Sequence, residues 1–258
     1  MRIRFLLSYI GTRYHGWQIQ ENTDATIQGA LEKALSVLCK GPVRVTGAGR
    51  TDAGVHALGQ VAHADIPQRL QQDLRTSLNA LLPWDIRVLD VSDAPDTFHA
   101  RFDAKEKTYI YHFWTEQGYV LPKRLAYVWP CGALDCDRMQ EALPFLIGTH
   151  DFASLQNAGF DTKSSVRTIL SATITHRTPS PYLPKTEPEY ALTITADGFL
   201  KQMVRNIAGI LVAVGKKKIE PSAVQAIVNA RSRKENPCVT APAAGLTLAH
   251  IAYPSSDA

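Results

Sequence analysis

Two parts of the chain repeat one pattern, a strand-like segment that is followed later by an amphipathic helix. In residues 3–10 and again in residues 107–114, apolar and polar side chains alternate with the period of two that a strand with one buried face requires. We therefore expect two halves that begin in the same way. The alternating apolar residues are Ile3, Phe5, Leu7 and Tyr9 in the first segment and Tyr109, Tyr111 and Phe113 in the second.

Helices are indicated where apolar residues recur at spacings of three and four. Residues 27–38 show this spacing after Thr26, a favoured N-cap residue, and residues 139–146 show it before Gly148. Further helices are predicted at 72–82, 199–214 and 222–230, and further strands at 43–46, 60–66, 166–176 and 190–196.

Several neighbouring strands have no helix between them, which favours an α+β fold with a largely antiparallel sheet over a doubly wound fold. A charged stretch at 102–106 precedes the second strand-rich half, so we expect two domains, 1–103 and 104–258. Residues 177–189 contain four prolines and are predicted to form an exposed loop.

The composition is that of an ordinary soluble globular protein, with 45% hydrophobic and 20% charged residues. No stretch approaches the roughly 20 apolar residues of a membrane-spanning helix, and the segment after Arg2 and Arg4 lacks the features of a secretory signal. Four cysteines are too few for a disulfide scaffold, so a reduced, cytoplasmic setting is expected. The net charge of +4 permits a polyanionic partner without requiring one.

The densest chemical signal is the segment GAGRTDAGVH at residues 47–56. Its three glycines indicate a tightly folded loop between two strands. A dinucleotide-binding turn would need a third glycine where Asp52 stands, and a carboxylate at that position would repel a pyrophosphate. A phosphate-binding P-loop would end in Gly-Lys-Ser or Gly-Lys-Thr, which is missing from this segment.

A metal site is a second alternative, because His56, His63, Asp52 and Asp65 are close in the sequence. The two histidines, however, are seven residues apart across a loop-to-strand transition, and no metal-binding spacing occurs, so no metal is expected. Asp52, two residues after Arg50, fits an ordinary Asx-turn beside a surface arginine. It also fits a carboxylate that a guanidinium keeps ionised, as a nucleophile requires, although the residues alone favour the Asx-turn.

The segment Gly-Arg-Thr-Asp-Ala-Gly-Val-His, with Gly59-Gln60-Val61 after it, resembles the catalytic motif of the TruA-type tRNA pseudouridine synthases. Motifs similar to others of this family occur in the same order over nearly the whole chain, and together they are very specific. They are Tyr9-x-Gly11-x-x-Tyr14-x-Gly16-Trp17-Gln18, Thr26-Ile27-Gln28-x-x-Leu31-Glu32, Phe98-His99-Ala100-Arg101-Phe102, Tyr109-x-Tyr111, Gly148-x-His150-Asp151-Phe152, Phe199-Leu200-x-x-Met203-Val204-Arg205 and Ala241-Pro242-x-x-Gly245-Leu246.

The resemblance implies a role for each matching residue. Asp52 corresponds to the nucleophile, and Arg50 to the arginine that helps to turn the target base out of its stack. Tyr109 corresponds to the active-site tyrosine, whose ring can stack on uracil. Arg205 corresponds to the partner of the catalytic aspartate, and the helical pattern of residues 199–214 predicts that Lys201 lies beside it on a polar face, where both can bind substrate.

The resemblance also implies two similar α/β halves that share a central, largely antiparallel sheet, with the catalytic cleft between them. It implies a homodimer that needs no cofactor and acts on uridines 38 to 40 in the anticodon stem-loop of tRNA. Two competing hypotheses are an RNA-binding or RNA-folding module without catalysis and a glycoside or nucleoside hydrolase. The first would not need Asp52, and the second usually requires a pair of acids, of which only one is evident.

Overall fold

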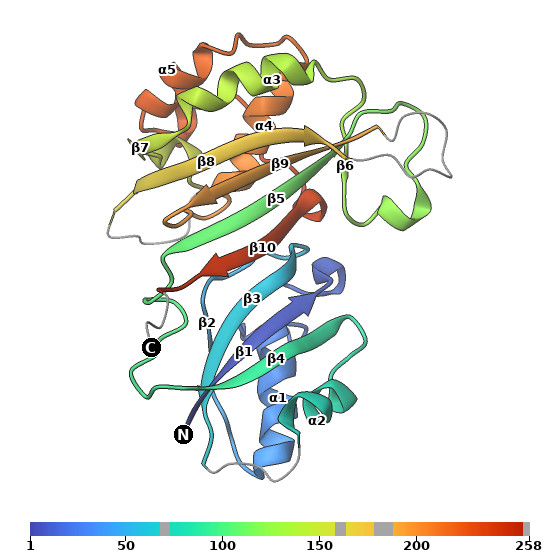
Figure 1. Cartoon of the computed structure of the whole chain (residues 1–258). Helices are drawn as coiled ribbons and strands as arrows, with labels where there is room; N and C mark the ends of the chain where they lie inside the picture. Colours follow the sequence, from blue (N-terminus) through green and yellow to red (C-terminus); the bar gives the residue numbers. More distant parts are fainter. Residues whose placement is uncertain (68–72, 158–163, 178–187, 255–258) are drawn as a thin grey trace. The chain divides into compact units, whose positions relative to one another are not determined.

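The computed structural model of the protein describes residues 1–67, 73–157, 164–177 and 188–254, which fall into two compact units (Figure 1). The first unit comprises Met1–Lys105 and the C-terminal segment from Thr247, and the second comprises Glu106–Leu246. Each unit combines helices with a mainly antiparallel set of strands, which confirms the α+β prediction. None of the helices in the described ranges is both long enough and apolar enough to span a bilayer.

The first unit is organised around a strand that pairs on both sides. Its elements are β1 (Arg2–Tyr9), α1 (Ile27–Cys39), β2 (Val45–Gly47), β3 (His56–Asp65), α2 (Leu74–Leu81), β4 (Ile86–Ala94) and β10 (Leu246–Ala252). Strand β1 is antiparallel to both β3 and β4. Strand β2 pairs antiparallel with the end of β3, and β10 pairs parallel with its beginning. Helices α1 and α2 lie on one face of these strands (Figure 1).

The predicted alternation of β1 is confirmed, because every second side chain of the strand is buried and the intervening ones are partly exposed. Helix α1 begins where the sequence predicts, since the Gly29 N–H donates to the Thr26 hydroxyl at 3.2 Å. The loop that carries the candidate nucleophile connects β2 to β3. Strand β3 pairs with β2 near its end and with β10 at its beginning.

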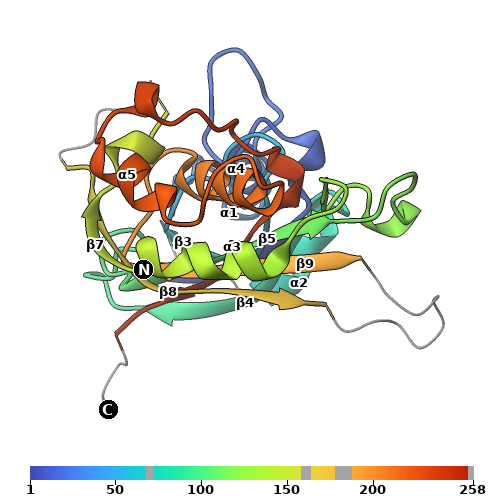
Figure 2. The same cartoon turned by 90° about the horizontal axis from the view of Figure 1, so that it is seen from above.

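The second unit has its sheet in the order β5-β9-β8-β7, with β6 parallel to β5. Its elements are β5 (Glu106–Trp114), β6 (Trp129–Pro130), α3 (Cys136–Ala142), β7 (Gly148–Asp151), β8 (Val166–His176), β9 (Glu189–Ala196), α4 (Met203–Gly215) and α5 (Ala223–Asn229), with short 3₁₀ turns at Pro122–Arg124, Leu143–Phe145, Ala153–Leu155, Arg233–Glu235 and Ala243–Gly245. Its helices lie on one side of the strands (Figure 2).

Several element predictions need correction. The strand expected at 60–66 begins at His56, and the helix expected at 199–214 begins at Met203, because Gln202 has a left-handed backbone with a φ of 60°. The helix expected through residue 146 ends at Ala142, and the 3₁₀ turn that follows contains Pro144, which has no N–H to donate. Strands β4, β6, β7 and β10 were not predicted.

Two predictions fall partly on residues outside the described ranges. Gln72, the expected start of the second helix, is one such residue, and α2 begins at Leu74 with Asp73 as its N-cap. Most of the proline-rich segment also lies outside, including Pro179, Pro181 and Pro184. The C-terminal strand β10, which the predicted domain division placed in the second half, pairs with β3 of the first unit.

A buried carboxylate stabilises the second unit. Glu189, at the start of β9, is fully buried and accepts hydrogen bonds from Arg124 at 2.6 and 2.8 Å. His112 lies 2.8 Å away, and Arg177 lies 3.2 Å away. Burial alone would raise the pKa of Glu189, but the bonds to His112 and Arg124 outweigh it and lower the pKa from 4.5 to about 2.

We expect Glu189→Gln to lower the free energy of unfolding by about 3 kcal/mol at neutral pH, because it leaves the largely buried Arg124 and the more exposed Arg177 without their counter-charge. Since the folded-state pKa is the lower one, the stabilisation is complete above the ordinary pKa of 4.5 and is lost as the pH falls toward 2. Urea unfolding measures both effects. The exposed ion pair of Glu220 with Arg138 provides the control, and Glu220→Gln should cost less than about 1 kcal/mol. Equal losses in the two variants would contradict the assignment.

Candidate active site

A buried glutamine, Gln60, donates a hydrogen bond to the backbone of the loop between β2 and β3. The Gln60 side chain, on β3, donates from Nε2 to the Gly49 carbonyl at 2.8 Å and to the Tyr9 hydroxyl at 3.4 Å. The Tyr9 hydroxyl also lies 2.9 Å from the Thr51 hydroxyl. Burial raises the pKa of Tyr9 to about 12, so its proton stays on the oxygen at neutral pH. Because that oxygen accepts from Gln60, its own proton is available for Thr51.

A second support comes from the segment between β1 and α1. The Trp17 N–H donates to the Thr51 carbonyl at 3.0 Å. Gly16 has a φ of +94°, and a Cβ added to it would lie 2.6 Å from the same carbonyl, so this approach requires a glycine. A Cβ added to Gly47 would lie 2.5 Å from the indole of Trp17, so this contact also requires a glycine. The loop is therefore clamped between residues 16–17 and Gln60.

The clamp determines which side chains of the loop face outward. Thr51 is buried, whereas Arg50 on one side of it is exposed and Asp52 on the other is half-buried. The Val55 N–H donates to the Asp52 carbonyl at 3.1 Å, so a turn closes directly after the carboxylate. Arg50 and Asp52 are thus carried two residues apart on a backbone whose position is strongly defined. An isolated Asx-turn on a free surface loop would not need this buried support.

We expect Gln60→Met to lower the rate of the reaction in which Asp52 is expected to take part by about 10- to 100-fold, because small displacements of reacting groups change rates by this factor. The variant keeps the side-chain volume but leaves the Gly49 carbonyl without its donor, which should also cost about 1–3 kcal/mol of stability. Single-turnover rates of the reaction that the family resemblance implies, together with thermal unfolding, measure the two effects. Gln20→Met, at an exposed glutamine that donates to the His15 carbonyl, is the matched control and should react at the normal rate.

The second unit carries the other three predicted residues. Tyr109 lies on β5, is 8% exposed, and makes an edge-to-face contact with Phe199, with ring centroids 5.2 Å apart. Lys201 follows Phe199 by two residues, in the segment that leads into α4. Tyr109 is therefore held against the segment that bears Lys201.

Arg205 lies in the first turn of α4, and its Nε donates to the Ala241 carbonyl at 2.7 Å. The next carbonyl, that of Pro242, accepts a hydrogen bond from Tyr111 at 2.8 Å. The predicted polar helix face shared by Lys201 and Arg205 is wrong, since Lys201 precedes the helix. Apart from Arg205 and Ala213, α4 is buried all round, as a helix inside a core must be.

Hydrogen bonds around the buried Asn206 side chain position the chain segment at Thr240 and Ala241, whose carbonyl accepts from Arg205. Asn206 donates to the Leu155 carbonyl at 2.7 Å and to the Asn157 side chain at 3.1 Å, and it accepts from Thr240 at 2.7 Å. Arg233 donates to Asn157 at 2.9 Å. The Ala241 carbonyl, next to Thr240, is thus positioned by residues that the sequence patterns did not single out.

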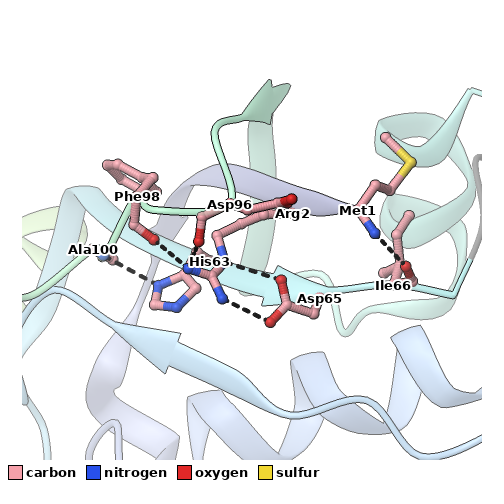
Figure 3. A network of polar contacts seen from close by, with 8 residues as sticks. All are labelled: Met1, Arg2, His63, Asp65, Ile66, Asp96, Phe98 and Ala100. Carbon is pink, nitrogen blue, oxygen red and sulfur yellow. Dashed lines mark hydrogen bonds and ion pairs between the residues drawn. The ribbon is translucent and has the colours of Figure 1, made fainter.

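Three of the four residues considered as metal ligands, His56, His63 and Asp65, have structural partners. His56 Nδ1 accepts the Gly11 N–H at 3.1 Å, and His63 Nδ1 accepts the Ala100 N–H at 3.1 Å (Figure 3). Asp65 is paired with Arg2 at 2.8 Å. Over the described ranges of the chain, no group of three or more His, Cys, Asp or Glu side chains is arranged to hold a metal ion.

The structure thus places Arg50 and Asp52 in the first unit and Tyr109, Lys201 and Arg205 in the second. The sequence patterns by themselves did not assign the supporting roles of Tyr9, Gln60 and Trp17. The only signal that could have found them was their presence in the motifs that flank the glycine-rich loop.

Comparison with known proteins identifies the family of the chain. A family model described as tRNA pseudouridine synthase matches residues 6–103 and 142–254, which include the loop of Asp52 and the whole of α4. A protein of Lawsonia intracellularis named tRNA pseudouridine synthase A is 48% identical over 258 residues, covering 98% of this chain and 99% of the relative. Its namesake from Nitratidesulfovibrio vulgaris strain Miyazaki F is 46% identical over 276 residues, covering 98% and 99%. This chain therefore belongs to the tRNA pseudouridine synthase family.

Proposed function

We propose that this protein isomerises uridine to pseudouridine at positions 38 to 40 of the anticodon stem-loop of tRNA, with Asp52 as its nucleophile. The observation that carries the proposal is the clamped loop, in which Thr51 is buried while Arg50 and Asp52 face outward. A carboxylate on a rigid, pre-positioned backbone suits covalent or proton-transfer chemistry. The length of the family match supports the same assignment.

The reaction breaks the N-glycosidic bond of uridine, turns the uracil while it is held, and joins its C5 to C1′ of the ribose. The hydrogen at C5 then leaves as a proton and N1, which has lost its bond to the ribose, takes up a proton, so no electrons are gained or lost overall. Asp52 is proposed to attack C1′, to attack the base, or to remove the C2′ proton, and these three routes remain open. Because the uracil is held in the site between cleavage of one bond and formation of the next, positioning is expected to contribute strongly to the rate.

The remaining residues hold the extruded nucleotide. The exposed guanidinium of Arg50 is suited to fill the space that the base leaves and to bind neighbouring phosphates. The Tyr109 ring, supported by Phe199, is suited to stack on uracil, and its phenol to assist removal of the C5 proton. Arg205 is the proposed ionic partner of Asp52, and Lys201 a substrate contact.

We propose further that the enzyme acts in the cytoplasm as a homodimer, without metal or cofactor. Two cationic side chains of the second unit have partners within the protein. Lys217 is paired with Asp135 at 3.3 Å, and Arg233 donates to the Asn157 side chain. Phosphate binding is therefore expected to rest on other lysines and arginines.

The proposal is tested by release of tritium from tRNA that is labelled at uracil C5, followed by mapping of the modified positions. The wild-type protein should release label and produce pseudouridine at positions 38 to 40. Binding of tRNA without release of label would favour an RNA-binding module. Release of free uracil would favour a hydrolase, because it would mean that water had attacked C1′ of the ribose.

A further inference from the structure

A short turn at residues 98–102 presents an aromatic ring to solvent. The side chain of Phe102 is 75% exposed, the largest value among the exposed large apolar residues of the described chain. This turn lies between β4 and β5 and contributes none of the residues assigned to the reaction. A phenylalanine in such a position has no part in the core of its own unit.

The turn itself is strongly anchored to the first unit. The Ala100 N–H donates to His63 on β3, and the Ala100 carbonyl accepts from the Tyr253 hydroxyl at 2.6 Å. Arg2, which is paired with Asp65, also donates to the Phe98 carbonyl at 2.9 Å (Figure 3). Bonds to the start and to the middle of the turn limit the freedom of its backbone.

Inside the turn, one imidazole orders the exposed ring. His99 Nδ1 accepts the N–H groups of Arg101 and Phe102, each at 3.2 Å, and the Asp103 carboxylate accepts the His99 N–H at 2.8 Å. The rings of His99 and Phe102 are stacked, with centroids 4.1 Å apart and an interplanar angle of 26°. The Arg101 guanidinium lies 5.8 Å from the centre of the Phe102 ring.

An ordered backbone that holds an apolar ring in water, with an imidazole on one side and a guanidinium beside it, has the features of a stacking platform for a nucleobase. We propose that Phe102 stacks on an unpaired base of the substrate RNA while Arg101 binds a neighbouring phosphate. This inference rests on the proposed function for its ligand. Pre-organisation favours binding, because the ring has little conformational freedom to lose on contact with RNA.

RNA is the ligand that the charges favour. Arg101 is exposed, and so is Lys105 three residues after Phe102. Of the two carboxylates in this stretch, that of Asp103 accepts the backbone N–H of His99, and that of Glu106 lies beyond Lys105. A polyanion that also offers aromatic faces satisfies both the ring and the cations, whereas an apolar protein surface would satisfy only the ring.

The test measures tRNA binding by substituted proteins at constant salt. We expect Phe102→Ala to weaken binding by about 5- to 100-fold, the range that base–aromatic stacking covers. Phe102→Trp keeps an aromatic face and should bind within about 3-fold of wild type, whereas Phe102→Leu keeps apolar volume only and should resemble alanine. Val37→Ala, at an apolar residue of α1 that is 60% exposed, is the control and should change nothing. Wild-type binding by Phe102→Ala, or full rescue by leucine, would overturn the proposal.

Photo-crosslinking identifies the partner directly. With p-benzoylphenylalanine at position 102, irradiation in the presence of tRNA should join the protein to RNA. An adduct only with a second copy of the chain, or no adduct, would overturn the platform. Tritium release by the wild-type protein is measured in the same preparations. If label is released while Phe102→Ala binds normally, only the platform fails, and if wild type releases no label, the proposed function fails instead.

Discussion

Asp52→Asn is expected to abolish tritium release, with a fall in rate of about 10⁴-fold or more, as is typical when a nucleophile is removed. Asparagine keeps the size and shape of the side chain but lacks the negative charge and most of the nucleophilicity. All three proposed routes through Asp52 require a carboxylate, so the expectation does not depend on choosing among them. The bonds that Trp17, Gln60 and Val55 make to backbone carbonyls of the loop remain in this variant and should keep the loop in place.

The same variant should still bind tRNA. Arg50 and the cationic side chains of the surface remain, and removal of a negative charge near phosphates favours binding. Asp24→Asn, at an exposed carboxylate of the first unit, is the matched control and should release label at the wild-type rate. Release of label by Asp52→Asn at close to that rate would show that the nucleophile has been misassigned. Loss of tRNA binding along with activity would instead indicate a disturbed loop.

Arg205→Lys is expected to lower the single-turnover rate by about 100-fold or more, although the charge is retained. The guanidinium uses Nε for the Ala241 carbonyl, which orients its plane, while its terminal nitrogens have the geometry for a carboxylate. A lysine has a single nitrogen and cannot rebuild both arrangements. The pH dependence of the rate should also change, because the proposed partner of Asp52 sets how readily that carboxylate stays ionised.

Arg231→Lys is the matched control for this experiment. Arg231 also belongs to the second unit, is largely exposed, and lies 4.0 Å from Asp151, so lysine can replace it at little cost. Its rate should match that of wild type. A normal single-turnover rate and pH profile in Arg205→Lys would remove Arg205 from the reaction and leave it as an anchor for the segment around Ala241.

Local pattern in the sequence predicted the elements whose burial alternates or recurs regularly. Strand β8 was predicted at the residues it occupies, β1 and β5 were predicted to within one residue at either end, and Thr26 caps α1 as expected. Strand β4 was missed because only its first part is buried, and β10 because its first three residues are buried in succession. Both strands owe their conformation to partners far away in the chain.

The glycine-rich motif predicted a tightly folded loop around Arg50 and Asp52, and its resemblance to a family motif, rather than the residue pattern alone, indicated the chemistry to expect of them. Only the tertiary structure decided how the loop is supported, because Gln60, Tyr9 and Thr51 meet through hydrogen bonds across as many as 51 positions of the chain. The same holds for α4, whose start at Met203 follows from the backbone of Gln202 and not from any periodicity. Periodicity reports which face of an element is apolar, whereas buried polar contacts depend on groups that come together only when the chain has folded.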